Sequence, residues 1–463
     1  MSQGQAAIGS SVTAVPIAAG RFALFLADPG GGVFTNSGNT EHGWAGWSRV
    51  SQGQAAIGSS VTAVPIAGVR FALFLADPNS GVFTTSGNAE HGWDQWSSVS
   101  EGRAAPGSSV AAVPITGGRF ALFVADPNGG VFTTSGDSSI PIKHVFVLVL
   151  ENRSFDHMLG FSGITGTDPT TGQPTIIDGL TGIESNNFTD PAGVVHTHTV
   201  ATGAADVMTT GPGHEFVDVL EQLCGPSAIY PSGGPYPPVT NFGYVSSYAK
   251  AVGPAAAGDV MKCFSPSQLP VLNALAQEFV VCDRWFSSMP GPTEPNRYFM
   301  HAATCGTFDD SPTRGEILEA VGSPGGGFEF KHGTVFKQLD KVGVNWRIYA
   351  DDHFPVAAEL DGVSVVFDIR EFADLAKDLR DPSFDAGYVH IEPSYDVLDS
   401  FEDGNSQHPN GSVAAGERFI KATYEAIRSS PVWEKSLLII TWDEHGGFYD
   451  HVIPGSAQET GER

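Results

Sequence analysis

The sequence lacks any long hydrophobic run. Its longest apolar stretches, such as the one that ends at Leu150, are much shorter than the ~18 residues that span a bilayer. We therefore expect no transmembrane segment. The first residues, MSQGQAAIGSSV, have neither the basic region nor the apolar region of a secretory signal peptide. The cytoplasm is the default location, and secretion stays open if the N-terminus is incomplete.

Basic residues and cysteines are also scarce. The chain has 24 Lys and Arg against 51 Asp and Glu, a formal net charge of −27. This charge repels nucleic-acid phosphates, so we expect no nucleic-acid partner. The cysteines lack the paired spacing of a zinc site and indicate buried thiols or one or two disulfides. They are Cys224, Cys263, Cys282 and Cys305. With 41% apolar residues, the chain has enough material for a core.

The first part of the chain is a repeat. Residues 51–99 repeat residues 2–50, and a third copy starts at Ser100 and fades after Gly136. Each copy has four strand-like runs between Gly, Ser and Asp-Pro turns, which is the content of one propeller blade. We assign residues 1–138 to this β-repeat module. Counted from the tryptophan strand, its complete four-strand units are 44–86 and 93–135.

The repeats resemble those of bacterial and fungal propeller lectins. The resemblance rests on the patterns WSxVSxGxAAxGSSVxAVP and ALFxADPNGGVFTTSG and covers residues 2–136. It implies an all-β, propeller-like module with carbohydrate as a possible partner. The module is incomplete, because a closed propeller has about four to eight blades.

From residue 139 the pattern changes to alternating strands and helices. The runs HVFVLVL, VVCDRWF and LLIITW predict strands, and SPSQLPVLNALAQEF (with Ser267 as its cap) and GERFIKATYEAIRSS predict helices. Strands that alternate with helices indicate an α/β domain, which we place at 139–463. Residues 160–260 form a long Gly- and Pro-rich insertion to which we assign no fold.

Polar residues follow two of these predicted strands directly. Glu151 and Asn152 follow the first, and Asp443 and Glu444 follow LLIITW. Ligands of open α/β sheets bind at the carboxyl ends of strands, so these groups are candidates for one oxygen-rich site. Three carboxylates so close require either raised pKa values or a hard divalent cation. The pair Gly446-Gly447 would allow close backbone approach there. The alternative is that the acids cap helices or pair with arginines.

Thr293 lies in the segment PGPTEPNR, where a helix begins. As an N-cap, its hydroxyl would sit beside free backbone N–H groups, a setting suited to phosphate. A hydroxyl that also binds a metal can lose its proton and attack phosphorus. The alternative is an ordinary capping threonine.

Three motifs in order resemble the phosphoesterase family of phosphatidylcholine-type phospholipases C and related acid phosphatases. They are ENRSFDHMLG at 151–160, PGPTEPNR at 290–297 and TWDEHGGFYDHV at 441–452, and the resemblance covers about residues 140–454. It implies a fold similar to alkaline phosphatase, with helices on both faces of a central sheet. The family includes secreted members, in which Cys282 and Cys305 could pair.

The resemblance also implies roles for single residues. Glu151, Asn152, Asp443 and Glu444 would bind one divalent metal ion together with Thr293, the nucleophile. The oxygen ligands favour calcium, magnesium or manganese.

Other residues near the phosphate are implied less directly. His408, in NSQHPNG, would protonate the leaving alkoxide or stabilise phosphoryl oxygens. Arg297 either clamps phosphate or pairs with a carboxylate. His353 is a weaker candidate for substrate binding, as are His445 and His451.

The leading hypothesis is a metal-dependent phosphoesterase that hydrolyses a phospholipid or a soluble phosphate ester through Thr293. The alternative is a carbohydrate-binding or interaction protein with an inactive phosphoesterase domain. It draws on the repeats and on the sequence end at Arg463, soon after the last motif, where family members continue.

Overall fold

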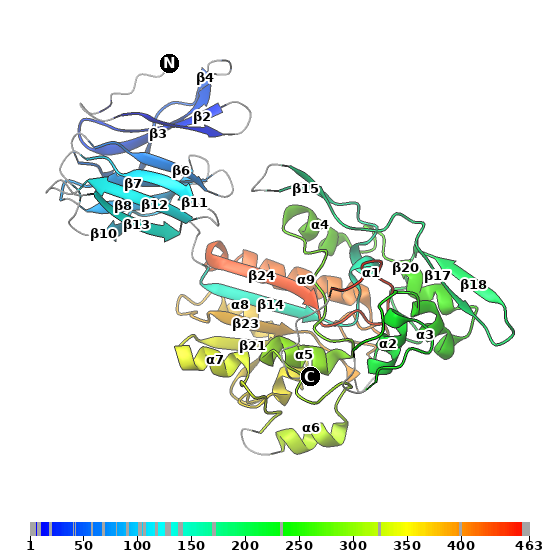
Figure 1. Ribbon diagram of the computed structural model, residues 1–463. Coiled ribbons are helices and arrows are strands. Elements are labelled where there is room, and N and C mark those ends of the chain that lie inside the picture. The colour runs from blue at the N-terminus through cyan, green and yellow to red at the C-terminus, as the bar shows by residue number, and fades with distance from the viewer. Residues whose placement is uncertain are drawn as a thin grey trace. The chain divides into compact units, whose positions relative to one another are not determined.

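The computed structural model divides into two compact units, residues 1–141 and 142–463 (Figure 1). In the second unit it describes residues 142–455 except 169–172, 232–234, 323–325 and 398–400. In the first unit it describes residues 6, 11–17, 21–39, 41, 43–56, 59–66, 70–79, 81–88, 92–100, 104, 108–115, 119–125 and 131–137.

The repeats fold into three antiparallel sheets, one for each copy. The first contains β1 (Thr13–Ile17), β2 (Arg21–Ala27), β3 (Gly32–Asn39), β4 (Gly43–Trp44) and β5 (Ser48–Gln54). The second contains β6 (Thr62–Ile66), β7 (Arg70–Ala76), β8 (Val82–Asn88), β9 (Gly92–Trp93) and β10 (Ser97–Ser100). The third contains β11 (Ala111–Ile115), β12 (Arg119–Ala125) and β13 (Val131–Asp137). Phe25 and Leu73 are fully buried in a core that the first two sheets share. The sequence predicts a half-buried strand with Phe22, Leu24 and Leu26 on one face, but Phe22 is 44% exposed and β7 is buried at consecutive positions, so this alternation was wrong.

The strand after each pair of tryptophans closes the preceding sheet. β5 pairs with β3, and β10 pairs with β8. The structural units are therefore 13–54 and 62–100. The units predicted from the sequence, 44–86 and 93–135, were wrong because they started at the tryptophan strand, which ends a sheet and does not begin one. The all-β character is confirmed, whereas closure into a propeller stays a prediction.

The second unit is an α/β fold with a five-stranded parallel sheet, in the order β22-β21-β23-β14-β24. The strands are β14 (His144–Leu150), β21 (Trp346–Ala350), β22 (Ile369–Glu371), β23 (Tyr388–Glu392) and β24 (Ser436–Trp442). β14 is central and almost wholly buried, as its continuous apolar run predicts. Because all five strands are parallel, their carboxyl ends lie at one edge.

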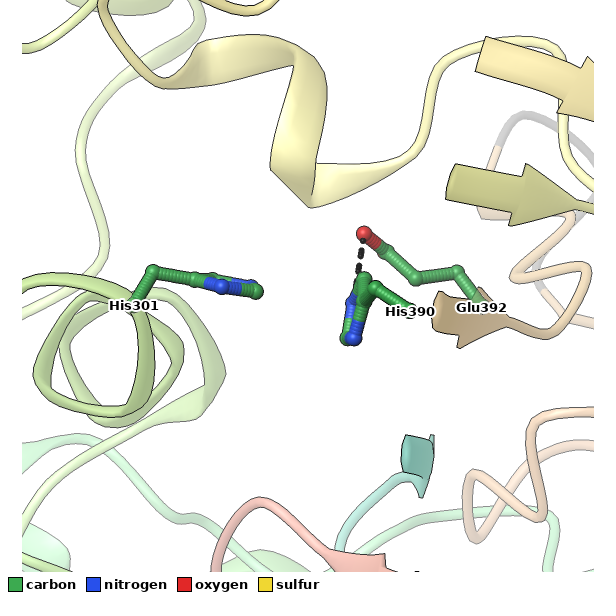
Figure 2. Close-up of side chains that lie close together, drawn as sticks. All are labelled: His301, His390 and Glu392. Atoms are coloured by element: carbon green, nitrogen blue, oxygen red, sulfur yellow. Dashed lines mark hydrogen bonds and ion pairs between the residues drawn. The ribbon is translucent and has the colours of Figure 1, made fainter. Parts of the chain in front are cut away.

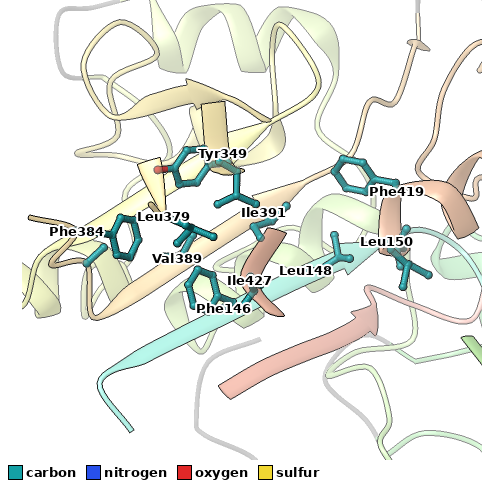
Figure 3. Packing of buried hydrophobic residues seen from close by; sticks show 13 residues of the cluster. Phe146, Leu148, Leu150, Tyr349, Leu379, Phe384, Val389, Ile391, Phe419 and Ile427 are labelled. Atoms are coloured by element: carbon teal, nitrogen blue, oxygen red, sulfur yellow. The ribbon is translucent and has the colours of Figure 1, made fainter. Parts of the chain in front are cut away.

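Helices pack on both faces of this sheet. They are α4 (Pro270–Glu278), α5 (Thr293–Ala302), α7 (Val335–Val342), α8 (Leu375–Asp378) and α9 (Val413–Arg428). One core joins β14 and β23 to α9 through side chains such as Phe146, Ile391 and Ile420 (Figure 3). A second core joins α5 and α7 to β21 through Tyr298 and Phe336, among others. α9 confirms the predicted helix, with Ser412 as its N-cap.

Two local expectations were wrong. Residues 280–286 form no strand: Val280 is 90% exposed, Trp285 is 69% exposed, and Arg284 forms an ion pair with Asp178. Residues with high β-propensity form a strand only where a neighbouring strand completes their backbone hydrogen bonds, and residues 280–286 have no such neighbour among the described residues. α4 begins at Pro270, beyond Ser267, because proline is favoured in the first helical turn.

The insertion 160–260 consists of small elements. They are β15 (Thr165–Thr167), β16 (Pro174–Ile176), β17 (Ser185–Thr189), β18 (Val195–Thr199), β19 (Ala201–Thr202), α2 (Phe216–Cys224), α3 (Tyr244–Val252) and η1 (Ala257–Met261). α3 and η1 pack on Phe448, which anchors the insertion next to the last sequence motif.

The remaining α-helices in the described ranges are α1 (Phe155–Leu159) and α6 (Arg314–Val321). All four cysteines are free thiols, with Cys282 exposed and Cys305 buried. Within the described ranges, every helix is too short or too polar to cross a bilayer.

Candidate active site

The sheet brings the two predicted strand ends together. β14 and β24 are neighbours, and Leu150 lies opposite Trp442 in their register. The backbone N–H of Asn152 donates to Asp443 Oδ1 at 3.0 Å, and the N–H of Glu444 donates to the same oxygen at 2.8 Å. The acidic and amide residues that follow the strands therefore form one buried polar cluster.

Thr293 joins this cluster from a segment 141 residues further along the chain. Its hydroxyl donates to Asn152 Oδ1 at 3.2 Å. Thr293 is the first residue of α5 and Pro292 holds the N-cap position, so the capping role was wrong by one residue. The hydroxyl is bound to the side-chain amide of Asn152 and does not cap the helix. Thr293 as a whole is 7% exposed.

Tight backbone turns hold the cluster together. Asn152 has a φ of 55°, a left-handed conformation that asparagine tolerates better than most residues. Gly446 also has a positive φ, of 65°, and a Cβ there would lie 2.0 Å from the carbonyl oxygen of Asn152. The expectation that Gly446-Gly447 allows close backbone approach is thus confirmed.

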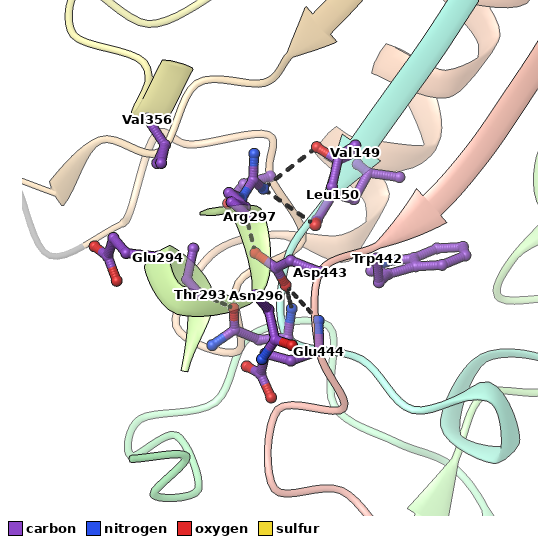
Figure 4. A network of polar contacts seen from close by, with 12 residues as sticks. Val149, Leu150, Thr293, Glu294, Asn296, Arg297, Val356, Trp442, Asp443 and Glu444 are labelled. Carbon is purple, nitrogen blue, oxygen red and sulfur yellow. Dashed lines mark hydrogen bonds and ion pairs between the residues drawn. The ribbon is translucent and has the colours of Figure 1, made fainter. Parts of the chain in front are cut away.

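Arg297 lies at the centre of a buried polar network (Figure 4). Its side chain has no exposed surface, and its Nε donates to Asp443 Oδ2 at 3.0 Å. One terminal nitrogen donates to Glu392 at 3.4 Å, and the other donates to the carbonyl of Leu150 at 3.2 Å. Of the two roles that the sequence left open, the geometry favours pairing with carboxylates.

The pKa values of the three neighbouring acids are shifted in different directions. Burial, with the charge of Asp443, raises the pKa of Glu151 to about 8. Burial also raises the pKa of Asp443, although Arg297 opposes the shift. Burial alone would raise the pKa of Glu444, but His214 and His445 beside it lower it to about 2. The raised values are one of the two outcomes expected for this cluster.

His214 belongs to the site and was missed by sequence reasoning. It lies in the loop before α2, and its Nδ1 is 3.1 Å from Glu444 Oε1 and 3.2 Å from the amide nitrogen of Asn152. Burial alone would lower the pKa of His214, but Glu444 raises it to about 9. A histidine within a Gly- and Pro-rich loop gives no periodic signal that could have identified it.

The other predicted histidines differ in position. His408 stacks on Phe401, with ring centroids 3.6 Å apart, and lies 6.2 Å from the ring of His214. Burial and the neighbouring His214 lower the pKa of His408 to about 3, so it is neutral. His353 is exposed in the loop after β21.

Two histidines of the last motif make carboxylate contacts. His445 Nδ1 lies 3.2 Å from Glu444, and His451 Nδ1 lies 2.8 Å from Asp156. His445 therefore borders the polar cluster, whereas His451 belongs to a neighbouring acidic group.

The donor chemistry of the cluster fits a hard divalent cation. Glu151 Oε2 is buried and accepts no hydrogen bond among the described residues, and the oxygens of Asn152 and Thr293 lie together. Asp443 is already occupied, by Arg297 and by two backbone N–H groups. The three carboxylates are not among the described groups whose ligand atoms all lie within 4.8 Å of one another. A bound cation would thus require side-chain movement at Asp443 or Glu444.

Comparison with known proteins identifies the family of the second unit. The model of the phosphoesterase family matches residues 142–463. The chain belongs to the phosphoesterase family. It is 36% identical over 320 residues to non-specific phospholipase C1 of Arabidopsis thaliana, a match that covers 67% of this chain and 54% of that protein. It is 27% identical over 341 residues to phospholipase C B of Mycobacterium tuberculosis, covering 68% of this chain and 60% of that protein.

The matched region spans little more than half the length of these curated relatives. Among solved structures, a fucose lectin from Kordia zhangzhouensis is similar over 28% of this chain and 94% of that chain. The identity is 12% and the TM-score 0.22, which carries no argument for this protein.

Proposed function

We propose that the second unit hydrolyses phosphoric esters, with Thr293 as the nucleophile. The observation that carries the proposal is the 3.2 Å contact between the Thr293 hydroxyl and Asn152, beside Asp443. It places a hydroxyl at the carboxyl edge of a parallel sheet, within a cluster of oxygen ligands. Membership of the phosphoesterase family supports the same reaction class.

In the proposed reaction the Thr293 oxygen attacks phosphorus in line. A bond forms between this oxygen and phosphorus, the bond to the ester oxygen breaks, and the hydroxyl proton ends on the departing alcohol. Water then cleaves the phospho-threonine and restores the hydroxyl. His408, whose ring lies 6.2 Å from that of His214, is the residue we propose to relay the proton.

Glu151, Asn152, Thr293, Asp443 and Glu444 would hold the divalent cation. When bound, it would lower the pKa of the attacking hydroxyl and neutralise charge on the phosphoryl oxygens. Arg297 would hold Asp443 in place from behind, because its Nε donates to Asp443 Oδ2.

A phospholipid is the favoured substrate class. The relatives in the comparison are named non-specific phospholipase C and phospholipase C. Soluble phosphomonoesters need the same attack on phosphorus, so the choice between them depends on the residues that surround the cluster. The insertion 160–260 supplies one of these residues, His214.

The test is hydrolysis of p-nitrophenyl phosphate and p-nitrophenyl phosphorylcholine by the full chain, with and without chelator. Thr293→Ala should abolish the turnover of both substrates. Thr313→Ala is the matched control, because Thr313 also lies at the start of a helix, as the N-cap of α6, and is outside the cluster. Chelator-sensitive turnover that only Thr293→Ala removes would support the proposal. Full turnover by a folded Thr293→Ala variant would refute it.

The repeat module supports a second candidate function, recognition of carbohydrate. The repeated sequence forms two five-stranded sheets and a third sheet of three described strands, and a repeated unit suits a multivalent ligand. If the chain were only a binding protein, glycans would bind while no divalent cation stabilised it against heat. A rise in melting temperature with added magnesium or calcium, which prefer oxygen ligands, separates the two hypotheses.

A further inference from the structure

A second group of metal-ligating side chains lies on the α5 face of the sheet. His301 is in the last turn of α5, and His390 and Glu392 are alternate residues of β23 (Figure 2). One ligand atom from each of the three lies within 4.8 Å of the other two. The two imidazole rings are 4.7 Å apart in an edge-to-face arrangement. The group is built by one helix and one strand, which are rigid elements.

The histidines have ring nitrogens that no protein group satisfies. His301 is 2% exposed, and among the described residues neither of its ring nitrogens has a hydrogen-bond partner. His390 is fully buried, and its Nδ1 also lacks a partner within the described structure. Burying polar atoms without partners is costly, so unpaired nitrogens on both rings of this group point to a ligand that binds one nitrogen of each ring.

Glu392 is held in position by its surroundings. It accepts hydrogen bonds from the backbone N–H groups of Val356 and Ala357, at 3.0 and 2.9 Å, and from the Tyr395 hydroxyl. His390 Nε2 lies 3.2 Å from its Oε1. Outer hydrogen bonds of this kind orient metal-ligating carboxylates and histidines in protein sites.

We propose that His301, His390 and Glu392 bind one divalent transition-metal ion, of which zinc is the best match. Two imidazoles and one carboxylate are a frequent zinc ligand set. Nitrogen donors favour zinc over magnesium or calcium, whereas the five residues proposed to hold the cation beside Thr293 would all bind through oxygen. The site is thus distinct in chemistry from the cation site of the proposed function, and it does not depend on that function.

One of the three proposed ligands borders a pocket. His301 lines an open pocket of about 960 Å³, together with His332, Lys337 and Asp361 among others. His390 and Glu392 are fully buried behind it, so we expect the ion to enter from the His301 side. Once bound, it would join the end of α5 to β23 and so hold in place the helix that begins with Thr293.

The test measures zinc bound to the full chain in the presence of excess magnesium, which competes for oxygen-rich sites. After dialysis against limiting zinc, the metal content is determined by mass spectrometry. We expect His301→Gln to lose one zinc per chain. His332→Gln is the matched control, because His332 is exposed in the same pocket, and it should bind as the native chain does. Equal zinc content in all three chains would overturn the proposal.

A second variant and a second measurement cover the case in which His301→Gln does not fold. Tyr395→Phe removes only one donor to Glu392 and should weaken zinc binding by about 10- to 100-fold. X-ray absorption at the zinc edge of the native chain then reads the ligands directly. Two imidazole nitrogens per zinc would support the site, and a shell of oxygens alone would overturn it.

Discussion

Replacement of Arg297 by methionine tests how the candidate site is held together. The guanidinium is fully buried and bridges Asp443, at 3.0 Å, and Glu392, at 3.4 Å. Methionine has a similar length but no charge, so two carboxylates would remain buried without their partner. Removal of one member of a buried ion pair costs about 3–5 kcal/mol. We expect Arg297→Met to lower the free energy of unfolding by that amount.

Urea unfolding of the native chain and the variant provides the measurement. Arg284→Met is the control, because Arg284 also forms an ion pair, with Asp178 at 2.6 Å, but its side chain is 68% exposed. Exposed pairs contribute about 0–1 kcal/mol, so this variant should unfold almost as the native chain does. A loss at Arg297 no larger than that at Arg284 would refute the buried-bridge reasoning.

The same variant separates the two roles that the sequence left open for Arg297. A phosphate clamp would raise KM for p-nitrophenyl phosphate while the free energy of unfolding stayed the same. A carboxylate bridge would lower stability and also lower kcat, because Asp443 would lose its position. Arg297→Lys keeps the charge but not the fork of donors, so its stability should lie between those of the native chain and Arg297→Met.

Three further outcomes are expected. His214→Ala should lower kcat by about 100-fold, read with p-nitrophenyl phosphate, while circular dichroism stays unchanged. Burial raises the pKa of Glu359 to about 8, although the Tyr298 hydroxyl opposes the shift, so the folded chain holds a proton that the unfolded chain releases. Stability should then fall as pH rises from about 4.5 to about 8, by up to about 1.4 kcal/mol per pH unit, and Glu359→Gln should flatten this slope in urea unfolding. Ile420→Ala, in the core, should cost about 2–5 kcal/mol in the same assay, whereas Lys421→Ala on the exposed side of α9 should cost less than about 0.5.

Two of the five strands, β14 and β24, could be predicted because their sequences carry one clear signal. β14 is an unbroken apolar run and ends in Glu151-Asn152, and β24 likewise ends in Asp443-Glu444. Polar residues directly after a strand of a parallel sheet must lie at its carboxyl edge, which is why the oxygen cluster could be expected. β24 itself is only partly buried, because it lies at the edge of the described sheet. The sequence could not show that β14 and β24 are neighbours, since nearly 300 residues separate them.

β23 escaped prediction for a physical reason. Its sequence YVHIE places His390 and Glu392 inside a fully buried strand, so the apolar run is interrupted. Their burial depends on partners from α5 and from the loop at Val356, which no local pattern reveals. His214 was missed for a related reason, because a long loop and not a periodic element brings it to the cluster.

One face of α5 connects the Thr293 cluster to the proposed zinc ligands. Thr293, Arg297 and His301 are spaced four residues apart, so they lie on the same side of the helix. They contact, in turn, Asn152 at the end of β14, the carboxylate of Asp443, and the ring of His390 in β23. A single helix face therefore carries the proposed nucleophile, the buried charge bridge and a proposed zinc ligand. Because these three contacts share one rigid element, loss of the ligand at the end of α5 should loosen the position of the hydroxyl at its start.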